Sequence, residues 1–278
     1  GCVYCYARNT HEYWGFSAGL DFEQKIIVKK NAAEILKKQL SSKNWKVSPI
    51  MLSGNTDCYQ PAEKKLEITK KILGVLNDYK HPVGIITKNS LILRDIEILK
   101  EMAKDNLVHV MISLTSLNES LRQKLEPRTT TSHQRLKTLE TLSANGIPCG
   151  VMTAPIIPGL NSMEIPELLK AASEHGAKSC GYTMVRLNGS IRELFIDWLE
   201  KNFPDAKEKI IHQIEDAHGG KTNDSRFGTR MRGEGNIAMA INRLFKIAKA
   251  KYFANESGFE FNCDSFGVPG EGKQLGLF

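Results

Sequence analysis

The first residues able to do chemistry are two cysteines at the very start of the sequence, in the stretch GCVYCYAR. Cys2 and Cys5 form a C-x2-C pair, and Tyr4 and Tyr6 flank the second cysteine. Thiols at this spacing serve in redox-active dithiols, in structural zinc sites and in iron–sulfur clusters. Each of these sites is incomplete here. For a redox-active dithiol, Val3 and Tyr4 stand where Gly and Pro are expected between the cysteines. A zinc site lacks its second ligand pair, and two thiolates alone cannot hold a cluster.

The elements that must position these cysteines alternate between strands and helices from about residue 31 to residue 186. Continuous apolar runs predict five strands, over 48–54, 83–88, 107–115, 147–155 and 178–187. Apolar residues at helical spacing predict helices over 31–40, 61–79, 90–104, 132–146 and 163–176. Because the strands are apolar throughout, the pattern predicts an α/β protein with a covered parallel sheet.

An incomplete β/α barrel explains this alternation better than a Rossmann fold. No G-x-G-x-x-G sequence follows any predicted strand, and no P-loop is present. In a barrel the functional residues lie at the carboxyl ends of the strands. In this sequence those ends are residues 53–57, 87–89, 113–115, 154–155 and Arg186.

After Arg186 the strands stop, and helices are predicted over 191–203, 205–220 and 237–253. We therefore expect a barrel over residues 1–186 and a C-terminal helical extension over 187–278 that caps one end of it. A basic, glycine-rich loop over 219–236 carries Arg226, Arg230 and Arg232. These guanidinium groups suit a phosphate. The alternative is an ordinary solvated loop.

The overall composition of the 278 residues is that of a soluble globular protein, with 41% hydrophobic and 25% charged residues. The net charge of +7 is compatible with an anionic partner. However, basic and acidic residues are interleaved, which favours solvated helix faces over a dedicated nucleic-acid surface. No apolar run reaches the ~18 residues of a membrane helix. Six scattered cysteines suit a reducing compartment, so we expect a cytoplasmic protein with no membrane association.

The opening motif and several later stretches resemble the radical S-adenosylmethionine (radical SAM) enzymes. CVYCYAR, with SGNTD after the next strand, is similar to their C-x3-C-x2-C region, whose first cysteine would then lie upstream of Gly1. More specifically, the chain resembles the spore photoproduct lyase-like branch, often labelled DNA repair photolyase. The stretches that carry this resemblance are IITKNS, VMISLTSLNESLRQKLEPRTTT, VMTAPIIPG, TRMRGEG and the terminal QLGLF. The resemblance implies a partial (β/α)6 TIM-like barrel.

The same resemblance implies a [4Fe-4S] cluster and SAM as cofactors, with Cys2 and Cys5 as two of the three cluster ligands. Three thiolates leave one iron open, where SAM would bind through its amino and carboxylate groups. A reductant such as flavodoxin or ferredoxin would supply the electron. Since the first cysteine would lie upstream, we expect the chain as printed to hold no cluster or a poorly ligated one.

The resemblance also assigns roles to single residues. Tyr6 matches a tyrosine of the hydrogen-atom relay and is the expected catalytic residue. The positions expected to contact SAM are Tyr4 beside the adenine, Ser53, Gly54, Asn55 and Thr56 at the methionine amino group, and Lys88 and Ser113. The lyase's hydrogen-donating cysteine has no counterpart, because Gly54 stands in its place and Cys58 lies four residues later.

The leading functional prediction is therefore a lyase-like radical SAM enzyme that cleaves SAM to a 5′-deoxyadenosyl radical. Its substrate is unknown, with a nucleic-acid lesion as one candidate, although the missing donor cysteine argues against thymine-dimer repair. Two alternatives are a nucleic-acid binding protein whose cluster is structural or lost, and a zinc or dithiol redox protein. Glu126 and Arg128 are expected either to form a salt bridge that shapes their loop or to bind SAM or substrate.

Overall fold

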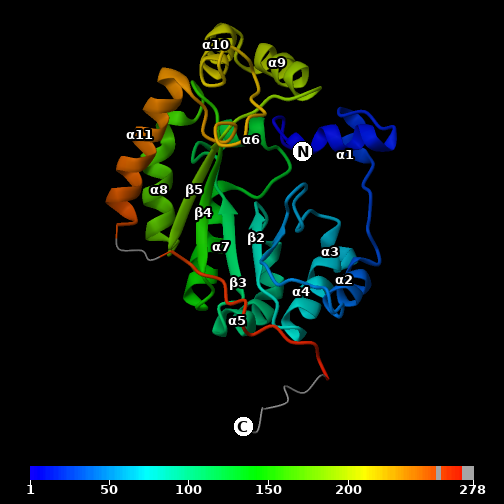
Figure 1. Ribbon diagram of the computed structural model, residues 1–278. Helices are drawn as coiled ribbons and strands as arrows, with labels where there is room; N and C mark the ends of the chain where they lie inside the picture. The colour runs from blue at the N-terminus through cyan, green and yellow to red at the C-terminus, as the bar shows by residue number, and fades with distance from the viewer. Residues whose placement is uncertain (255–257, 271–278) are drawn as a thin grey trace.

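The computed structural model describes residues 1–254 and 258–270, and its centre is a parallel sheet of five strands (Figure 1). The strands are β1 (Ile50–Leu52), β2 (Val83–Thr87), β3 (Val108–Ser113), β4 (Cys149–Ile156) and β5 (Ser179–Met184). They lie side by side in the order of the sequence, and every neighbouring pair is parallel. The predicted α/β class and all five predicted strands are therefore confirmed. A barrel of six strands stays a prediction.

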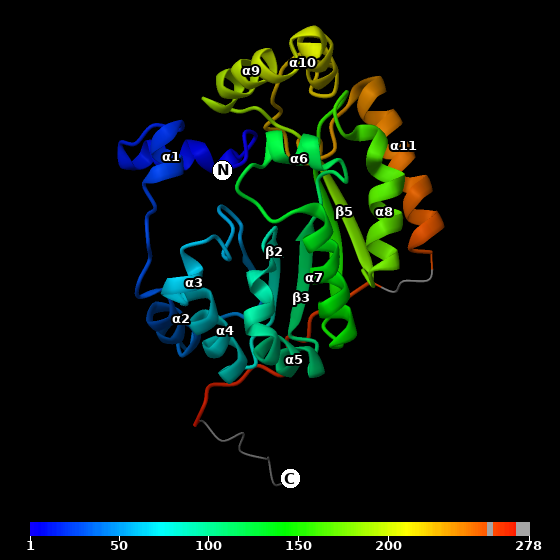
Figure 2. The same cartoon turned by 180° about the vertical axis from the view of Figure 1, so that it is seen from behind.

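Helices cover one face of this sheet. They are α2 (Ala32–Leu40), α4 (Ile68–Asp78), α5 (Ile96–Lys104), α7 (Ser132–Ala144) and α8 (Ile165–Glu174). The strands stand in front of α5 and α7 in Figure 1 and behind them in Figure 2, which is the view from the other side. One large apolar cluster joins the strands to these helices, with Ile85, Val110 and Val151 fully buried at its centre.

Several short elements differ from the prediction. The single helix expected over 61–79 is wrong: it is divided into α3 (Glu63–Leu66) and α4, because Glu67 adopts a left-handed conformation with φ 51°. Likewise the 90–104 stretch begins as a 3-10 helix, η2 (Ser90–Asp95), before α5. The helices predicted over 163–176 and 205–220 likewise begin as the 3-10 turns η3 (Ser162–Glu164) and η4 (Pro204–Ala206). The sequence patterns did not indicate η1 (Tyr6–Trp14), α1 (Leu20–Gln24) or α6 (Glu119–Leu125).

The last part of the chain lies against the rest of the fold at three places. Helices α9 (Ile191–Asn202) and α10 (Lys207–Asp216) lie beyond the carboxyl ends of the strands, whereas α11 (Gly235–Tyr252) runs along α8 (Figures 1 and 2). The tail crosses the opposite end, where Asn262 N donates to Asn106 O at 3.1 Å. The division into 1–186 and 187–278 stays a prediction, and the QLGLF stretch lies outside the described residues.

Within the described ranges, no helix combines the length and the apolar character that a bilayer-spanning segment needs.

Candidate functional site

The two cysteines lie on a turn that other backbone groups hold in place. Cys5 N donates to Cys2 O at 3.3 Å, and Val3 N donates to Leu125 O at 3.1 Å. The buried Arg8 side chain donates to Cys2 O at 3.1 Å and also forms an ion pair with Glu23. Both thiols are free and partly buried. Three hydrogen bonds therefore hold the backbone of the turn that carries the two thiols.

Next to this turn, Tyr4 joins a buried polar network centred on Glu126. The Tyr4 hydroxyl and the Thr115 hydroxyl both donate to Glu126 Oε1, the latter at 2.7 Å. Arg135, which is 1% exposed, forms an ion pair with Glu126 Oε2 at 2.5 Å and donates to Ser113 O at 3.0 Å. Glu126 thus links the cysteine turn to the carboxyl end of β3.

The electrostatics of this network follow from one buried negative charge among two cations. Burial alone would raise the pKa of Glu126, but the charges of Arg135 and Lys88 and the hydrogen bonds outweigh it and hold that pKa at about 2. The Cys2 thiol shows the opposite balance, since burial and the nearby Glu126 raise its pKa to about 12. Burial lowers the pKa of Lys88, yet Glu126 and Cys2 raise it more. Lys88 is therefore a cation at neutral pH.

The loop after β1 contains the four residues expected at the methionine end of SAM. Ser53 has φ 68°, an uncommon conformation for a residue with a side chain, and its Oγ accepts a hydrogen bond from Cys58 N at 2.9 Å. The Tyr6 hydroxyl donates to Gly54 O at 2.8 Å, and Asn55 Nδ2 donates to Thr10 Oγ1 at 3.3 Å. Thr56 is exposed on the same loop. The loop is thus tied to the helical turn that follows the cysteines.

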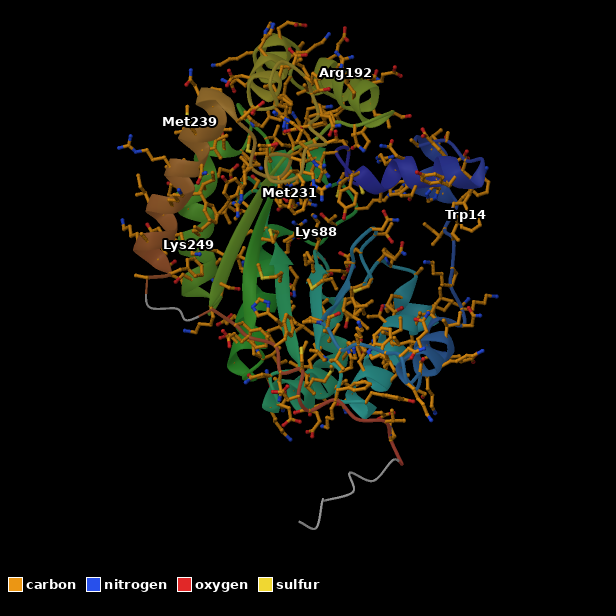
Figure 3. All side chains as sticks on the ribbon, in the orientation of Figure 1. Trp14, Lys88, Arg192, Met231, Met239 and Lys249 are labelled. Atoms are coloured by element: carbon orange, nitrogen blue, oxygen red, sulfur yellow. The ribbon has the colours of Figure 1, made fainter. Side chains whose placement is uncertain are left out.

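Asp57 connects the loop after β1 to the carboxyl end of β2. Its carboxylate accepts hydrogen bonds from Thr87 Oγ1 and Lys88 N, both at 2.8 Å, and from Tyr59 N at 2.9 Å. This contact sets the backbone of Lys88 at the carboxyl end of β2. In Figure 3 Lys88 lies between the strand ends and the segment that carries Met231.

The structure therefore brings most predicted residues to one edge of the sheet. Tyr6 lies within electrostatic reach of Cys5, Lys88 and Arg186: burial and Cys5 raise its pKa, whereas the two cations lower it. Ser113 contributes its backbone oxygen to the same edge and is itself buried. Among the described residues, no three Cys, His, Asp or Glu side chains form a metal-binding group. Cys2 and Cys5 lie on the N-terminal turn, and the third free cysteine near them in the fold, Cys58, lies on the loop after β1.

The alternative of a Glu126–Arg128 salt bridge is wrong. Glu126 pairs with Arg135, whereas the exposed Arg128 lies 3.7 Å from Glu23. Sequence reasoning named Thr115 only as one of the strand-end residues and did not single out Arg135. The one available signal was an arginine at position 135, between Ser132 and Leu136 on the face of α7 that is buried.

Two cavities open at opposite ends of the sheet. A cleft of about 650 Å³ beside the site is lined by Tyr6, Asn9, Thr10, Glu12, Tyr13, Asn188 and Gly189. Another cavity, of about 570 Å³, lies at the amino ends of the strands, between residues such as His109, Ser179 and Phe259. Because the predicted site residues gather near the carboxyl ends of the strands, the cleft beside Tyr6 is the one relevant to the candidate site.

Comparisons with known proteins agree with this arrangement. The sequence model of the radical SAM superfamily matches residues 1–172. An uncharacterized protein of Mycobacterium tuberculosis is 34% identical over 206 residues, which cover 73% of this chain and 61% of the relative. An uncharacterized protein of Methanocaldococcus jannaschii is 28% identical over 213 residues, covering 76% of this chain and 75% of the relative. The chain thus spans about three fifths of the mycobacterial protein's length.

Among solved structures, spore photoproduct lyase complexed with dinucleoside spore photoproduct has a TM-score of 0.64 at 14% identity, covering 94% of this chain and 73% of that one. A mutant of the same lyase with bound AdoMet and dinucleoside spore photoproduct has a TM-score of 0.61 at 13% identity, with the same coverage. These likenesses establish the fold. Since the superfamily match extends over more than half of the sequence, the chain belongs to the radical SAM superfamily.

Proposed function

We propose that the protein binds a [4Fe-4S] cluster through Cys2 and Cys5 and cleaves SAM reductively to a 5′-deoxyadenosyl radical. The radical would then take a hydrogen atom from a substrate, for which a nucleic-acid lesion is the leading candidate. The observation that carries the proposal is the meeting of the cysteine turn, the loop after β1 and Lys88 at one strand edge. Supporting it, the solved lyase structures with this fold contain AdoMet or a dinucleoside photoproduct.

The residues present fit part of the ligand set that such a cluster needs. Two free, partly buried thiols on a fixed turn suit thiolate ligation. The third thiolate would come from outside the described residues. Since the pKa of Cys2 is about 12, an incoming metal ion must displace its proton. When bound, the cluster would supply the electron that breaks the bond between the SAM sulfur and C5′.

The other residues would bind and orient SAM. Lys88, held by Asp57 at its backbone, would pair with the SAM carboxylate, and the backbone of residues 53–56 would contact the methionine amino group. Tyr4, fixed by Glu126, would pack beside the adenine. The Tyr6 hydroxyl, which now donates to Gly54 O, would give its hydrogen atom to the substrate radical at the end of the reaction. One electron from the reductant and one proton would then restore the tyrosine.

The test is anaerobic reconstitution of the full-length protein with iron and sulfide. We expect absorbance near about 410 nm, typical of thiolate-ligated clusters, and release of 5′-deoxyadenosine after dithionite is added. Cys2→Ala and Cys5→Ala should abolish both, whereas Cys180→Ala, in β5, should retain them. A wild-type protein that binds zinc without sulfide, or forms no 5′-deoxyadenosine, would contradict the proposal.

A further inference from the structure

We propose that Arg186 and Arg230 together bind one phosphate group of a nucleic-acid substrate, and that the cleft beside Tyr6 receives the adjoining nucleoside. The inference rests on the proposed function and names the substrate class for that same site. Arg186 follows β5, and Arg230 lies on the segment between α10 and α11.

The backbone brings the two arginines to the same place. Met184 N donates to Met231 O and Leu187 N donates to Thr222 O, both at 2.9 Å, so the segment 222–231 runs beside residues 184–187. Val185 and Leu187, on either side of Arg186, are each 2% exposed in the apolar cluster beneath α9 and α10. Because side chains of an extended segment alternate, Arg186 points away from that cluster. Its electrostatic neighbours are Arg230, Tyr6 and Asp224.

The arginines on these two segments differ in whether they have a carboxylate partner. Arg226 forms ion pairs with Asp224 and Glu234, and Arg232 lies over the Tyr182 ring at 4.2 Å. Within the described part of the chain, by contrast, no carboxylate lies within ion-pair distance of Arg186 or Arg230. Burial and the charge of Arg230 both lower the pKa of Arg186.

Asp224, the carboxylate that acts on Arg186 electrostatically, is already paired with Arg226. Two neighbouring guanidinium groups that form no ion pair of their own suit an oxyanion, because their paired N–H groups match phosphate oxygens. Lys88 is the cation nearer the cysteine turn, within electrostatic reach of Cys2 and Glu126, and it would serve the SAM carboxylate. The two arginines are left for a second anion. Arg226, which the sequence pattern grouped with Arg230, is instead a structural residue of the loop.

The surroundings of this pair favour a nucleotide over a small oxyanion. Tyr6 connects the arginines to the cleft of about 650 Å³, and Asn188, two residues after Arg186, lines the same cleft. The exposed rings of Tyr6 and Tyr13 offer faces on which a base can stack. Phe227, on the same loop, is 93% exposed, and the Arg230 guanidinium lies over its ring, 5.7 Å from the centroid. A positive pair beside aromatic rings is typical of single-stranded nucleic-acid sites.

The test measures binding of fluorescein-labelled single-stranded decathymidylate to the full-length reconstituted protein by fluorescence anisotropy, over a range of salt concentrations. Arg186→Gln and Arg230→Gln should each weaken binding about tenfold and lower the salt slope by about 0.7 per lost contact. The double variant should lose less than the product of the single losses, because both side chains hold one phosphate. Arg243→Gln removes the same charge from an exposed position on α11 and should bind like the wild type.

Equal affinity of Arg186→Gln, Arg230→Gln and Arg243→Gln would overturn the inference. It would also fail if both arginine variants weakened SAM binding as much as oligonucleotide binding, since the pair would then hold the SAM carboxylate. A wild type that releases 5′-deoxyadenosine but does not bind the oligonucleotide would refute this substrate class alone. Oligonucleotide binding through both arginines without any 5′-deoxyadenosine would instead refute the proposed radical chemistry.

Discussion

Glu126 is the residue on which the site's internal order depends, since it joins the cysteine turn, β3 and α7 through Tyr4, Thr115 and Arg135. Arg135→Met would leave a fully buried carboxylate without its ion-pair partner and should lower the free energy of unfolding by about 3–5 kcal/mol. Arg128→Met removes a mostly exposed arginine with a weak contact to Glu23 and should change the free energy of unfolding by less than about 0.5 kcal/mol. Urea unfolding of both variants measures the difference. Equal losses would contradict the assignment of Arg135 as the partner.

His81 gives the fold a dependence on acid. It is fully buried, its Nε2 accepts a hydrogen bond from Trp45 Nε1 at 3.2 Å, and its Nδ1 faces Pro82 O at 3.0 Å. The ring is therefore neutral, and burial lowers its pKa below the usual value of about 6.5. Because the unfolded chain binds the proton more readily, stability is full above about pH 6.5 and falls below it, by at most about 1.4 kcal/mol per pH unit for one group.

The measurement for this prediction is urea unfolding between pH 7.5 and pH 5. His81→Gln should weaken the fall in stability on acidification, although it also lowers stability at neutral pH by disturbing the Trp45 contact. His212→Gln, at an exposed position of α10, serves as the control and should leave the acid dependence unchanged. An identical pH profile for His81→Gln and the wild type would exclude His81 as its source.

At the scale of elements, the break between α3 and α4 combines an unfavourable backbone conformation at Glu67 with a tertiary ion pair of Glu63. Glu67 is left-handed there, and Glu63 Oε2 accepts a hydrogen bond from Ile68 N at 2.9 Å while Oε1 pairs with Arg94. Glycine tolerates this conformation without steric cost, so Glu67→Gly should be more stable than Glu67→Ala by about 1 kcal/mol. Thermal and urea unfolding of both variants compare the two side chains at one position. The reverse order would mean that residue 67 does not keep this conformation in solution.

The same break explains which parts of the fold the sequence could predict. Apolar runs specify strands such as β2 and β4 because burial on both faces leaves a continuous local pattern. The helical pattern of 61–79, in contrast, continues without interruption through Glu67. The break is accompanied by contacts of the Glu63 carboxylate with Ile68 N and with Arg94, and Arg94 is distant in sequence. Short elements such as η1 carry too few residues for periodicity to be read.

The candidate site was predictable to the extent that strand ends and a cysteine motif indicate it. Lys88 and the loop after β1 follow strands directly, so their meeting with the cysteine turn agrees with the predicted topology. The pairing of Glu126 with Arg135 was not predictable, because nine residues and a turn separate them and Arg128 is nearer in sequence. The unequal compensation of Arg226 and Arg230 likewise depends on where Asp224 and Glu234 lie after folding.

For the whole molecule, the core indicates one cooperative unit that includes the C-terminal helices. Phe245 of α11 is 5% exposed, its ring lies 4.5 Å from that of Tyr182 in β5, and both belong to the apolar cluster that holds the sheet together. Tyr4 belongs to a second cluster with Leu187 and Phe195. The N-terminal turn therefore shares an apolar cluster with α9, and α11 shares one with the sheet.

Phe245→Ala should consequently lower the stability of the entire chain, by about 3 kcal/mol for the loss of a large buried ring, while unfolding stays a single transition. Met239→Ala, at a 60% exposed position on the same helix, should cost less than about 0.5 kcal/mol. Circular dichroism follows the whole chain. The fluorescence of Trp198, with Trp14 and Trp45 replaced by Phe, follows α9 and its contact with Lys124 O. Coincident midpoints support a shared core, because a change at α11 then destabilises the sheet as well. If Phe245→Ala lowered only the Trp198 midpoint, the C-terminal part would be an independent domain, and the position of Arg230 beside Arg186 would not be maintained by the core.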